Sequence, residues 1–264
     1  MKSLLSISYN SDASKSRATE FAKTQGYPCV ADTEVTTTLK LHFTDDKVEL
    51  CDLEKEFCID IDFIAGNLAH RQQYGGGRGQ SIAKAIGLKQ GLAPPSVLDA
   101  TAGLAKDAYV LACLGCRLTL LERSPVIVEL INDAIERAKE NEWFQKIIDR
   151  GFNVITNSSI DYLSELFDKS KDNLVSVLLP DVIYLDPMYP ERKKSASVKK
   201  NMQILQTLLG KDEDTEELLT IALKVAKKRV VVKRPKAAET LSSIKPTYQV
   251  NSKKTRYDVY IIQS

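Results

Sequence analysis

From about position 96 to the end of the chain, apolar residues form short runs separated by longer stretches with helical spacing. The short, β-branched runs predict strands, and the stretches between them predict helices. One helix is expected to begin where Ser124 can act as the N-cap and Pro125 can take the first helical position. Strands that alternate with helices predict a parallel sheet covered on both faces. The five predicted strands are SVLDA, CRLTLLE, FNVITN, DVIYLD and RVVVKR.

The two ends of the chain follow other patterns. The last two apolar runs, TYQVNS and YDVYIIQ, are separated by a few polar residues, which predicts an antiparallel hairpin at one edge of the sheet. Residues 1–63 are interpreted as a small α+β subdomain, 64–95 as a connecting glycine-rich loop with helices, and 96–264 as the main domain. The segments expected in the subdomain are Leu4–Ser8, Ser11–Gln25, Glu34–Phe43, Lys47–Cys51 and Phe57–Phe63.

Composition narrows the class of protein without identifying it. The 264 residues are 43% hydrophobic and 27% charged with a net charge of +2, a balance typical of globular domains. The odd count of five cysteines argues against a disulfide framework. Cys113 and Cys116 lie in an apolar run and are expected to be small buried residues, and His42 and His70 are the only imidazoles, so no metal site is expected. No membrane span or secretory signal is predicted, which favours the cytoplasm.

A tight turn after the first strand of the main domain is a candidate cofactor site. Asp99 ends the strand, and the small residues that follow, including Thr101 and Gly103, would let a ligand approach the backbone before the helix that carries Asp107. Packing of a helix against a strand is the alternative use of such a turn. In open parallel sheets, ligands bind beyond the carboxyl ends of the strands.

The next two strands end in residues that suit a nucleoside. Glu122, about twenty residues after the turn, could accept both hydroxyls of an adenosine ribose. Ser158 and Ser159 follow the third strand, where they could cap a helix or contact adenine. NAD would fit the same layout, but its pyrophosphate favours a turn richer in glycine. A cationic sulfonium suits acidic neighbours such as Asp99 and Asp186, so the pattern favours S-adenosylmethionine and methyl transfer.

The fourth strand ends in a motif suited to an amine substrate. Asp186, with a nearby main-chain carbonyl, could accept the two N–H groups of an exocyclic amine and orient its lone pair. Pro187 would stiffen the turn, and Tyr189 could stack on an unstacked base. Whether Asp186 removes the proton or only orients the amine is left open. Adenine in DNA and glutamine in protein offer amines that would suit the same motif.

These motifs together resemble the RsmJ-type family, bacterial methyltransferases of guanine N2 in small-subunit (16S) ribosomal RNA. The resemblance covers residues 64–264 and implies a class I (Rossmann-like) methyltransferase sheet and S-adenosylmethionine as cofactor. It implies cofactor contacts by Asp107, Glu122, Asp186, Lys106, Arg123, Ser158 and Ser159. The family more often has Gly-Arg where this chain has Ala105-Lys106. The matching segments are 69–87, 97–125, 182–190, 193–200, 229–235 and 256–260.

Basic residues near the motifs are candidates for RNA binding, and 16S rRNA in the 30S subunit is the partner that the resemblance implies. A glycine-rich loop at 74–79 is flanked by basic side chains, and two further basic stretches follow the fourth and fifth strands. A bare linker and solvated helical faces are the alternatives. The candidates are His70, Arg71, Arg78, Lys193, Lys194, Lys199, Lys200, Lys233 and Arg234.

Three competing functions stay open at this point. An amino-methyltransferase acting on DNA adenine or protein glutamine would use the same motif. A non-catalytic RNA-binding assembly factor could keep the fold, although retention of both Glu122 and Asp186 argues against it. An NAD-dependent oxidoreductase would need a set of hydride-transfer residues that the sequence does not show.

Overall fold

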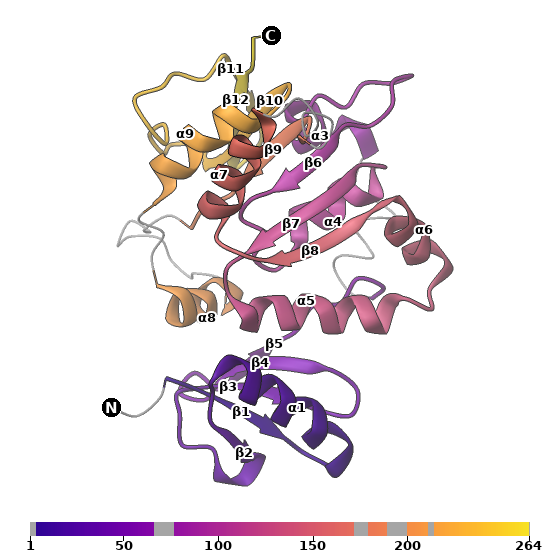
Figure 1. Cartoon of the computed structure of the whole chain (residues 1–264), viewed down its shortest axis with the longest axis vertical. Helices are drawn as coiled ribbons and strands as arrows, with labels where there is room; N and C mark the ends of the chain where they lie inside the picture. Colours follow the sequence, from indigo (N-terminus) through magenta and orange to yellow (C-terminus); the bar gives the residue numbers. More distant parts are fainter. Residues whose placement is uncertain (1–3, 66–76, 172–178, 189–199, 211–213, 264) are drawn as a thin grey trace. The chain divides into compact units, whose positions relative to one another are not determined.

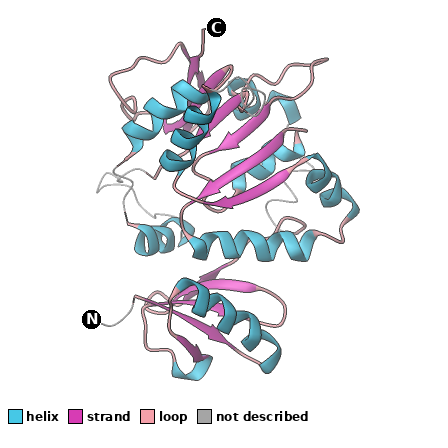
Figure 2. Ribbon diagram, viewed as in Figure 1, coloured by secondary structure: helices cyan, strands magenta, loops and turns pink. Residues whose placement is uncertain are grey.

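The computed structural model describes residues 4–65, 77–171, 179–188, 200–210 and 214–263. These form two compact units, one from the described parts of 1–62, 124–137 and 189–211, and one from the described parts of the rest. This division differs from the one predicted from the sequence, because a helix from the middle of the chain belongs to the first unit. Figure 2 shows strands and helices in both units.

The first unit is built on a five-stranded sheet with strand order β2-β1-β3-β4-β5. β1 is parallel to β2 and β3, whereas β3, β4 and β5 are antiparallel neighbours. Helix α1 begins at a capping box formed by Ser11 and Ser14 and ends at Gly26, whose φ of 74° suits glycine. The elements are β1 (Leu5–Tyr9), α1 (Asp12–Gln25), β2 (Cys29–Ala31), β3 (Leu39–Phe43), β4 (Val48–Asp52) and β5 (Phe57–Ile59).

Ion pairs hold the middle helix α5 (Pro125–Ala138) within the first unit. Arg17 of α1 lies 3.2 Å from Asp133 and 3.8 Å from Glu129 of this helix. Arg137 also pairs with Asp133, at 2.8 Å, and donates to the main-chain carbonyl of Ile61. The contacts of Arg17 with α5 and of Arg137 with Ile61 join residues more than seventy positions apart in sequence, so apolar periodicity could not reveal them. Helix α8 (Lys200–Leu209) belongs to the same unit.

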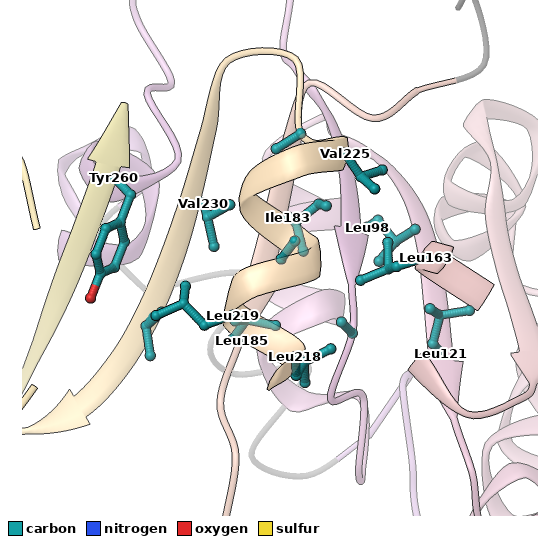
Figure 3. Close-up of a cluster of buried hydrophobic side chains, with 14 residues drawn as sticks. Leu98, Leu121, Leu163, Ile183, Leu185, Leu218, Leu219, Val225, Val230 and Tyr260 are labelled. Carbon is teal, nitrogen blue, oxygen red and sulfur yellow. The ribbon is translucent and has the colours of Figure 1, made fainter. Parts of the chain in front are cut away.

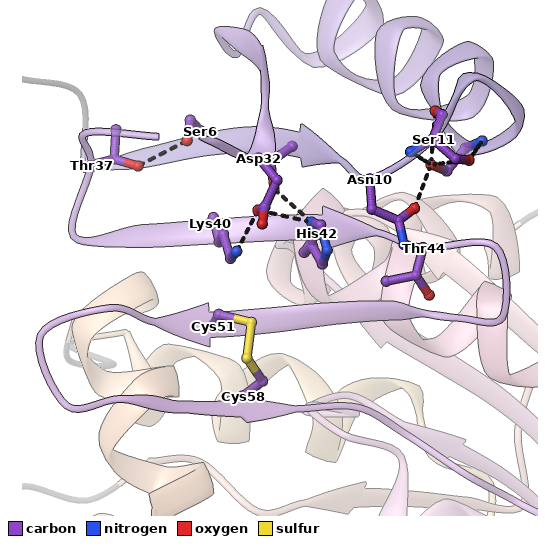
Figure 4. Close-up of polar contacts among 12 residues, drawn as sticks. Ser6, Asn10, Ser11, Asp32, Thr37, Lys40, His42, Thr44, Cys51 and Cys58 are labelled. Atoms are coloured by element: carbon purple, nitrogen blue, oxygen red, sulfur yellow. Dashed lines mark hydrogen bonds and ion pairs between the residues drawn. A yellow bond between two sulfur atoms is a disulfide. The ribbon is translucent and has the colours of Figure 1, made fainter. Parts of the chain in front are cut away.

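The cysteines correct one expectation. Cys51 of β4 and Cys58 of β5 are directly opposite each other and form a disulfide (Figure 4). A count of cysteines cannot show such a pairing, because it depends on the register of two antiparallel strands. Cys113 and Cys116 are free, as expected for packing residues. Burial raises the pKa of each thiol to about 12, so both stay protonated at neutral pH.

The second unit contains a seven-stranded sheet with strand order β11-β12-β10-β9-β6-β7-β8. Five strands are parallel, and β12 pairs antiparallel with β10 and β11, which confirms the predicted sheet and its terminal hairpin. Strands β7 and β8 are added on one side of β6, and β9 and β10 on the other, so the strand order switches between β6 and β9. The strands are β6 (Ser96–Asp99), β7 (Arg117–Glu122), β8 (Phe152–Thr156), β9 (Val182–Leu185), β10 (Arg229–Pro235), β11 (Tyr248–Asn251) and β12 (Thr255–Ile261).

Helices cover the two faces of this sheet (Figure 1). Leu163 of α7 and Leu219 of α9 pack against Ile183 and other buried side chains of one face (Figure 3). Tyr184, the next residue along β9, points to the opposite face and contacts α4. None of the described helices is both long and apolar enough to cross a bilayer. The helices of this unit are α3 (Ser81–Ala85), α4 (Lys106–Cys113), α6 (Glu142–Arg150), α7 (Ser159–Ser170) and α9 (Thr215–Val225), with a 3-10 turn at Gly77–Gly79.

Candidate functional site

Acidic residues gather at the carboxyl ends of the central parallel strands. Asp99 ends β6, Glu122 ends β7, and Asp186 directly follows β9. β6 and β9 are neighbours on either side of the point where the chain reverses direction across the sheet. Such a switch point is where open α/β sheets bind ligands. Because parallel strands end at one edge, side chains distant in sequence meet there.

The turn after β6 is held by main-chain hydrogen bonds from both sides. The Ala100 N–H donates to the carbonyl of Tyr184 at 2.9 Å, and the Ala102 N–H donates to that of Leu121 at 3.1 Å. Gly103 has a φ of 49°, and its N–H donates to the Glu122 carboxylate at 3.0 Å. This backbone conformation is left-handed, which favours glycine at the position. The hydrogen bond from the Gly103 N–H orients the Glu122 side chain toward the turn. The predicted turn and the predicted ribose acceptor are therefore in direct contact.

A lysine lies between two carboxylates of the site, those of Asp107 and Asp186. The Lys233 ammonium of β10 lies 2.7 Å from a carboxylate oxygen of Asp107 and 2.7 Å from one of Asp186. The Tyr184 hydroxyl donates to the same Asp107 oxygen at 2.7 Å. The Asp186 main-chain N–H donates to the Thr101 hydroxyl at 2.6 Å, which ties the two loops together. The result is one connected polar network across β6, β9, β10 and the start of α4.

Burial and mutual repulsion shift the titration of these groups. Burial raises the pKa of Asp99 to about 8, with the charges of Asp107 and Asp186 adding to the rise and the Thr101 N–H opposing it. Partial burial also raises the pKa of Asp186, against the opposing charge of Lys233. Burial disfavours the charged form of Lys233, but its two carboxylate partners outweigh burial and raise its pKa. At neutral pH Asp99 is therefore mainly protonated, and Lys233 stays close to both Asp107 and Asp186.

The donor set fits a cationic ligand better than an anionic one. Three aspartates face a single lysine, and the buried Glu122 lies on the neighbouring strand. An excess of carboxylates inside a site is stabilised when a cation binds there. A Cβ built on Gly103 would have no heavy atom closer than 3.9 Å, so the backbone of the turn is open to a ligand. A pyrophosphate would meet several carboxylates at this edge, which disfavours NAD.

Comparison with known proteins decides the family. The model described as "Putative SAM-dependent methyltransferase" matches residues 28–262. The chain belongs to this family. It is 48% identical to Ribosomal RNA small subunit methyltransferase J of Colwellia psychrerythraea over 90% of this chain and 84% of that protein. It is 45% identical to the protein of the same name from Shewanella baltica over 90% of this chain and 95% of that one. A SAM-dependent methyltransferase of Neisseria gonorrhoeae has a similar structure, with a TM-score of 0.72, 32% identity and coverage of 98% and 97%.

These relatives confirm the RsmJ-type resemblance, the class I methyltransferase fold and S-adenosylmethionine as the cofactor of this methyltransferase. The residues present fit that cofactor. Glu122, at the end of β7, would hold a ribose, and the carboxylates of Asp107 and Asp186, which share the single Lys233, would suit its positive charges.

Four other predicted cofactor residues lie around the edge of the site. Lys106 is exposed at the start of α4, and Arg123 forms an exposed ion pair with Asp214 at 3.3 Å. Ser158 caps α7 by accepting from the main chain of Asp161 at 3.4 Å. Ser159 donates to the carbonyl of Ala100 at 2.6 Å and so supports the turn after β6. Both serines therefore have partners within the protein.

Several predicted RNA-binding and catalytic residues lie outside the described part of the chain. Pro187 is described; it is buried directly after Asp186. Arg78 is exposed and donates to the carbonyl of Lys89 at 2.8 Å. Lys200, in the first unit, places its ammonium 5.4 Å from the centre of the Phe57 ring. The residues outside the description are His70, Arg71, Tyr189, Lys193, Lys194 and Lys199.

Lys233 and Arg234 require a correction to the RNA-binding prediction. The Lys233 ammonium is held between two carboxylates inside the site. Arg234 is buried, with 6% of its surface exposed, and donates twice to the carbonyl of Glu239, at 2.9 and 2.6 Å. A cation in either position is directed toward protein oxygens, away from an incoming phosphate.

Tyr184 and the role of Lys233 were missed by reasoning from the sequence. Tyr184 stands two positions before Asp186, so the alternation of an extended strand directs it toward the same face. Lys233 follows Val232, which pairs with Leu185 in the neighbouring strand, so it reaches the same level as Asp186. The sequence does show that Lys233 is a charged residue at the carboxyl end of an otherwise apolar strand. That pattern alone does not distinguish a lysine exposed to solvent from one that lies in a binding site.

Proposed function

We propose that this methyltransferase transfers a methyl group to the exocyclic N2 amine of a specific guanosine in 16S rRNA of the small ribosomal subunit. The observation that carries the proposal is the position of Asp186, tethered through Thr101 and Lys233 beside the turn that contacts Glu122. The relatives named Ribosomal RNA small subunit methyltransferase J support the choice of substrate. A substrate in the ribosome also favours a cytoplasmic location.

The amine needs help from this chain because its lone pair is conjugated with the base. When bound, S-adenosylmethionine supplies an electrophilic methyl group whose bond to sulfur breaks with the electron pair leaving on sulfur. Asp186 accepts an N–H of the amine, which directs the nitrogen lone pair at the incoming carbon. Its second carboxylate oxygen stays with Lys233, so the carboxylate keeps a fixed orientation.

The proton on the amine becomes acidic only as the new N–C bond forms. Lys233, 2.7 Å from Asp186, favours the charged form of this carboxylate and opposes the rise in its pKa that burial causes. The proposed order is therefore methyl transfer first and loss of one amine proton afterwards, to Asp186 or to water. Asp186 then acts mainly by orienting the amine. The guanine must leave its stack to reach this edge.

A labelled-methyl assay tests the proposal. Purified protein and labelled S-adenosylmethionine are incubated with 30S subunits from cells lacking the enzyme, and the RNA is digested to nucleosides. We expect label in N2-methylguanosine from 16S rRNA. Parallel incubations with naked DNA and with protein extract cover the two competing amines. Label confined to N6-methyladenine in DNA, or to methylglutamine, would contradict the proposed substrate.

A further inference from the structure

Two exposed turns lie side by side at the same edge of the sheet as the site. One turn, residues 235–239, follows β10, and the other, residues 252–254, joins β11 to β12. They are adjacent because Pro235 pairs with Thr255 across the antiparallel strands, and the Lys236 N–H donates to the carbonyl of Lys254 at 3.2 Å. Lys236 is three residues beyond Lys233, roughly 10 Å along the chain at the rise of a strand.

A buried arginine framework supports these turns from below. Arg256, 6% exposed, donates to the carbonyls of Lys236 at 3.0 Å and Glu239 at 3.2 Å, and also to that of Ala238. Its guanidinium is held in turn by the buried carboxylate of Asp258 at 2.9 Å. Together with the two bonds from Arg234 to the Glu239 carbonyl, this framework fixes the path of the first turn. The backbone of the first turn is therefore held in a defined conformation, and the Lys236–Lys254 hydrogen bond links the second turn to it.

Three lysines project from this supported surface. Lys236, Lys253 and Lys254 are all exposed, and none of them forms an ion pair with any residue that the structure describes. The two turns contain one acidic residue, Glu239, and the main-chain carbonyl of that residue points into the arginine framework. We call Lys236, Lys253 and Lys254 the lysine rim. Its positive charge is available to a partner in solution.

We propose that the lysine rim binds backbone phosphates of the RNA strand that flanks the target nucleotide. The inference rests on the proposed function, because a base delivered to Asp186 brings its own backbone to this edge of the sheet. Phosphate contacts position a nucleic acid without reading its sequence, and flexible ammonium groups suit that task. The rim replaces Lys233 and Arg234 as the RNA-facing part of this region.

The test compares two triple variants with equal loss of charge. Lys236→Gln with Lys253→Gln and Lys254→Gln removes the rim. Lys224→Gln with Lys227→Gln and Lys228→Gln removes three lysines near the amino end of β10 in the same unit. Binding to 16S rRNA is measured at several salt concentrations, with S-adenosylhomocysteine binding as a check of the folded site. Each phosphate contact to a single strand contributes about 0.7 to the salt slope, so the rim variant should lose about 2.

We expect the rim variant to bind RNA roughly 10- to 100-fold more weakly at 0.1 M salt, with unchanged cofactor binding. Its KM for 30S subunits should rise while kcat at saturating subunits stays the same. An RNA affinity and salt slope equal to those of the control triple would overturn the lysine rim. Failure of the wild-type protein to methylate 30S subunits would contradict the proposed function instead. The salt slope is read without catalysis, so the two failures are distinguishable.

Discussion

Two polar clusters built around aspartate and lysine, one from each unit, differ in how their charges are balanced. In the first unit, Asp32 accepts from Lys40 and from Ser8 at 3.3 Å, and lies 3.3 Å from the ring of His42 (Figure 4). There one carboxylate has several donors. In the second unit, Lys233 is shared by two carboxylates, with Asp99 close enough to feel their charge. The first cluster is satisfied within the fold, whereas the second has an excess of negative charge.

The direction of the pKa shifts separates the two clusters. Burial acts to raise the pKa of Asp32, but its hydrogen bond from Lys40 and the other donors outweigh burial and lower it. Asp99 and Asp186 both have raised pKa values, because burial and neighbouring carboxylates outweigh the donors. A satisfied cluster stabilises the fold, and an unsatisfied one stores unfavourable electrostatic energy that a cationic ligand relieves. This difference supports our proposal that the second cluster is the functional one.

The largest expected effect is on the rate of methyl transfer, and it should distinguish Asp186 of the second cluster from Asp32 of the first. Asp186→Ala should lower the rate of methyl transfer by about 10²- to 10⁴-fold, because the amine loses its acceptor. The protein should stay folded, as circular dichroism would show. Asp32→Ala is the matched control and should leave the rate at saturating substrate unchanged. Equal losses in both variants would erase the distinction between the clusters.

Replacing Lys233 should have an intermediate effect on kcat and should change how kcat depends on pH. Without Lys233, the pKa of Asp186 rises further, since an opposite charge nearby lowers a carboxylate pKa by about 1 to 3 units. Loss of kcat on acidification should therefore begin at higher pH in Lys233→Met than in the wild type. Lys233→Arg should restore the wild-type position of this acidic limb.

The matching variant in the first unit is Lys40→Met, whose pH profile of kcat should coincide with that of the wild type. If kcat of Lys233→Met is lower at every pH but falls on acidification at the same pH as in the wild type, the role of Lys233 is purely structural.

A further effect concerns stability and not catalysis. Asp99 has a folded-state pKa of about 8 against an unfolded value near 4, so the folded state binds the extra proton between these values. The free energy of unfolding should therefore fall as pH rises from about 4 to about 8, by at most ~1.4 kcal/mol per pH unit from this residue. Asp99→Asn should remove that slope in denaturant titrations. A slope that survives the substitution would assign the pH dependence to other groups.

Much of the second unit could be predicted from the sequence. Apolar periodicity located all five parallel strands and the terminal hairpin. The signal is clearest in central strands such as β9, which is buried along its whole length and reads as a continuous apolar run. Strand ends then located Asp99, Glu122 and Asp186, since parallel strands present their carboxyl ends at one edge. The short edge strand β2 (Cys29–Ala31) was missed, because three half-buried residues leave no periodic signal.

Other features depend on tertiary contacts that no local pattern records. The Cys51–Cys58 disulfide follows from strand register, and the placement of α5 in the first unit follows from ion pairs with Arg17. Lys233 and Arg234 are adjacent basic letters, yet one bridges carboxylates and the other lies buried beneath a turn. Which side chain of a basic run faces water is decided by the strand it ends and the loop that folds over it.

Calorimetric titration of S-adenosylhomocysteine into wild-type and Glu122→Ala protein tests the central claim most directly, namely that the carboxyl edge of the seven-stranded sheet binds the cofactor. Loss of a hydrogen-bonded charged acceptor contributes about 1.5 to 3 kcal/mol, so affinity should fall by roughly 10- to 150-fold. Binding of 16S rRNA, measured on the same preparations, should be unchanged. Unaltered cofactor affinity, or an equal loss of RNA binding, would contradict the assignment of this edge as the cofactor site.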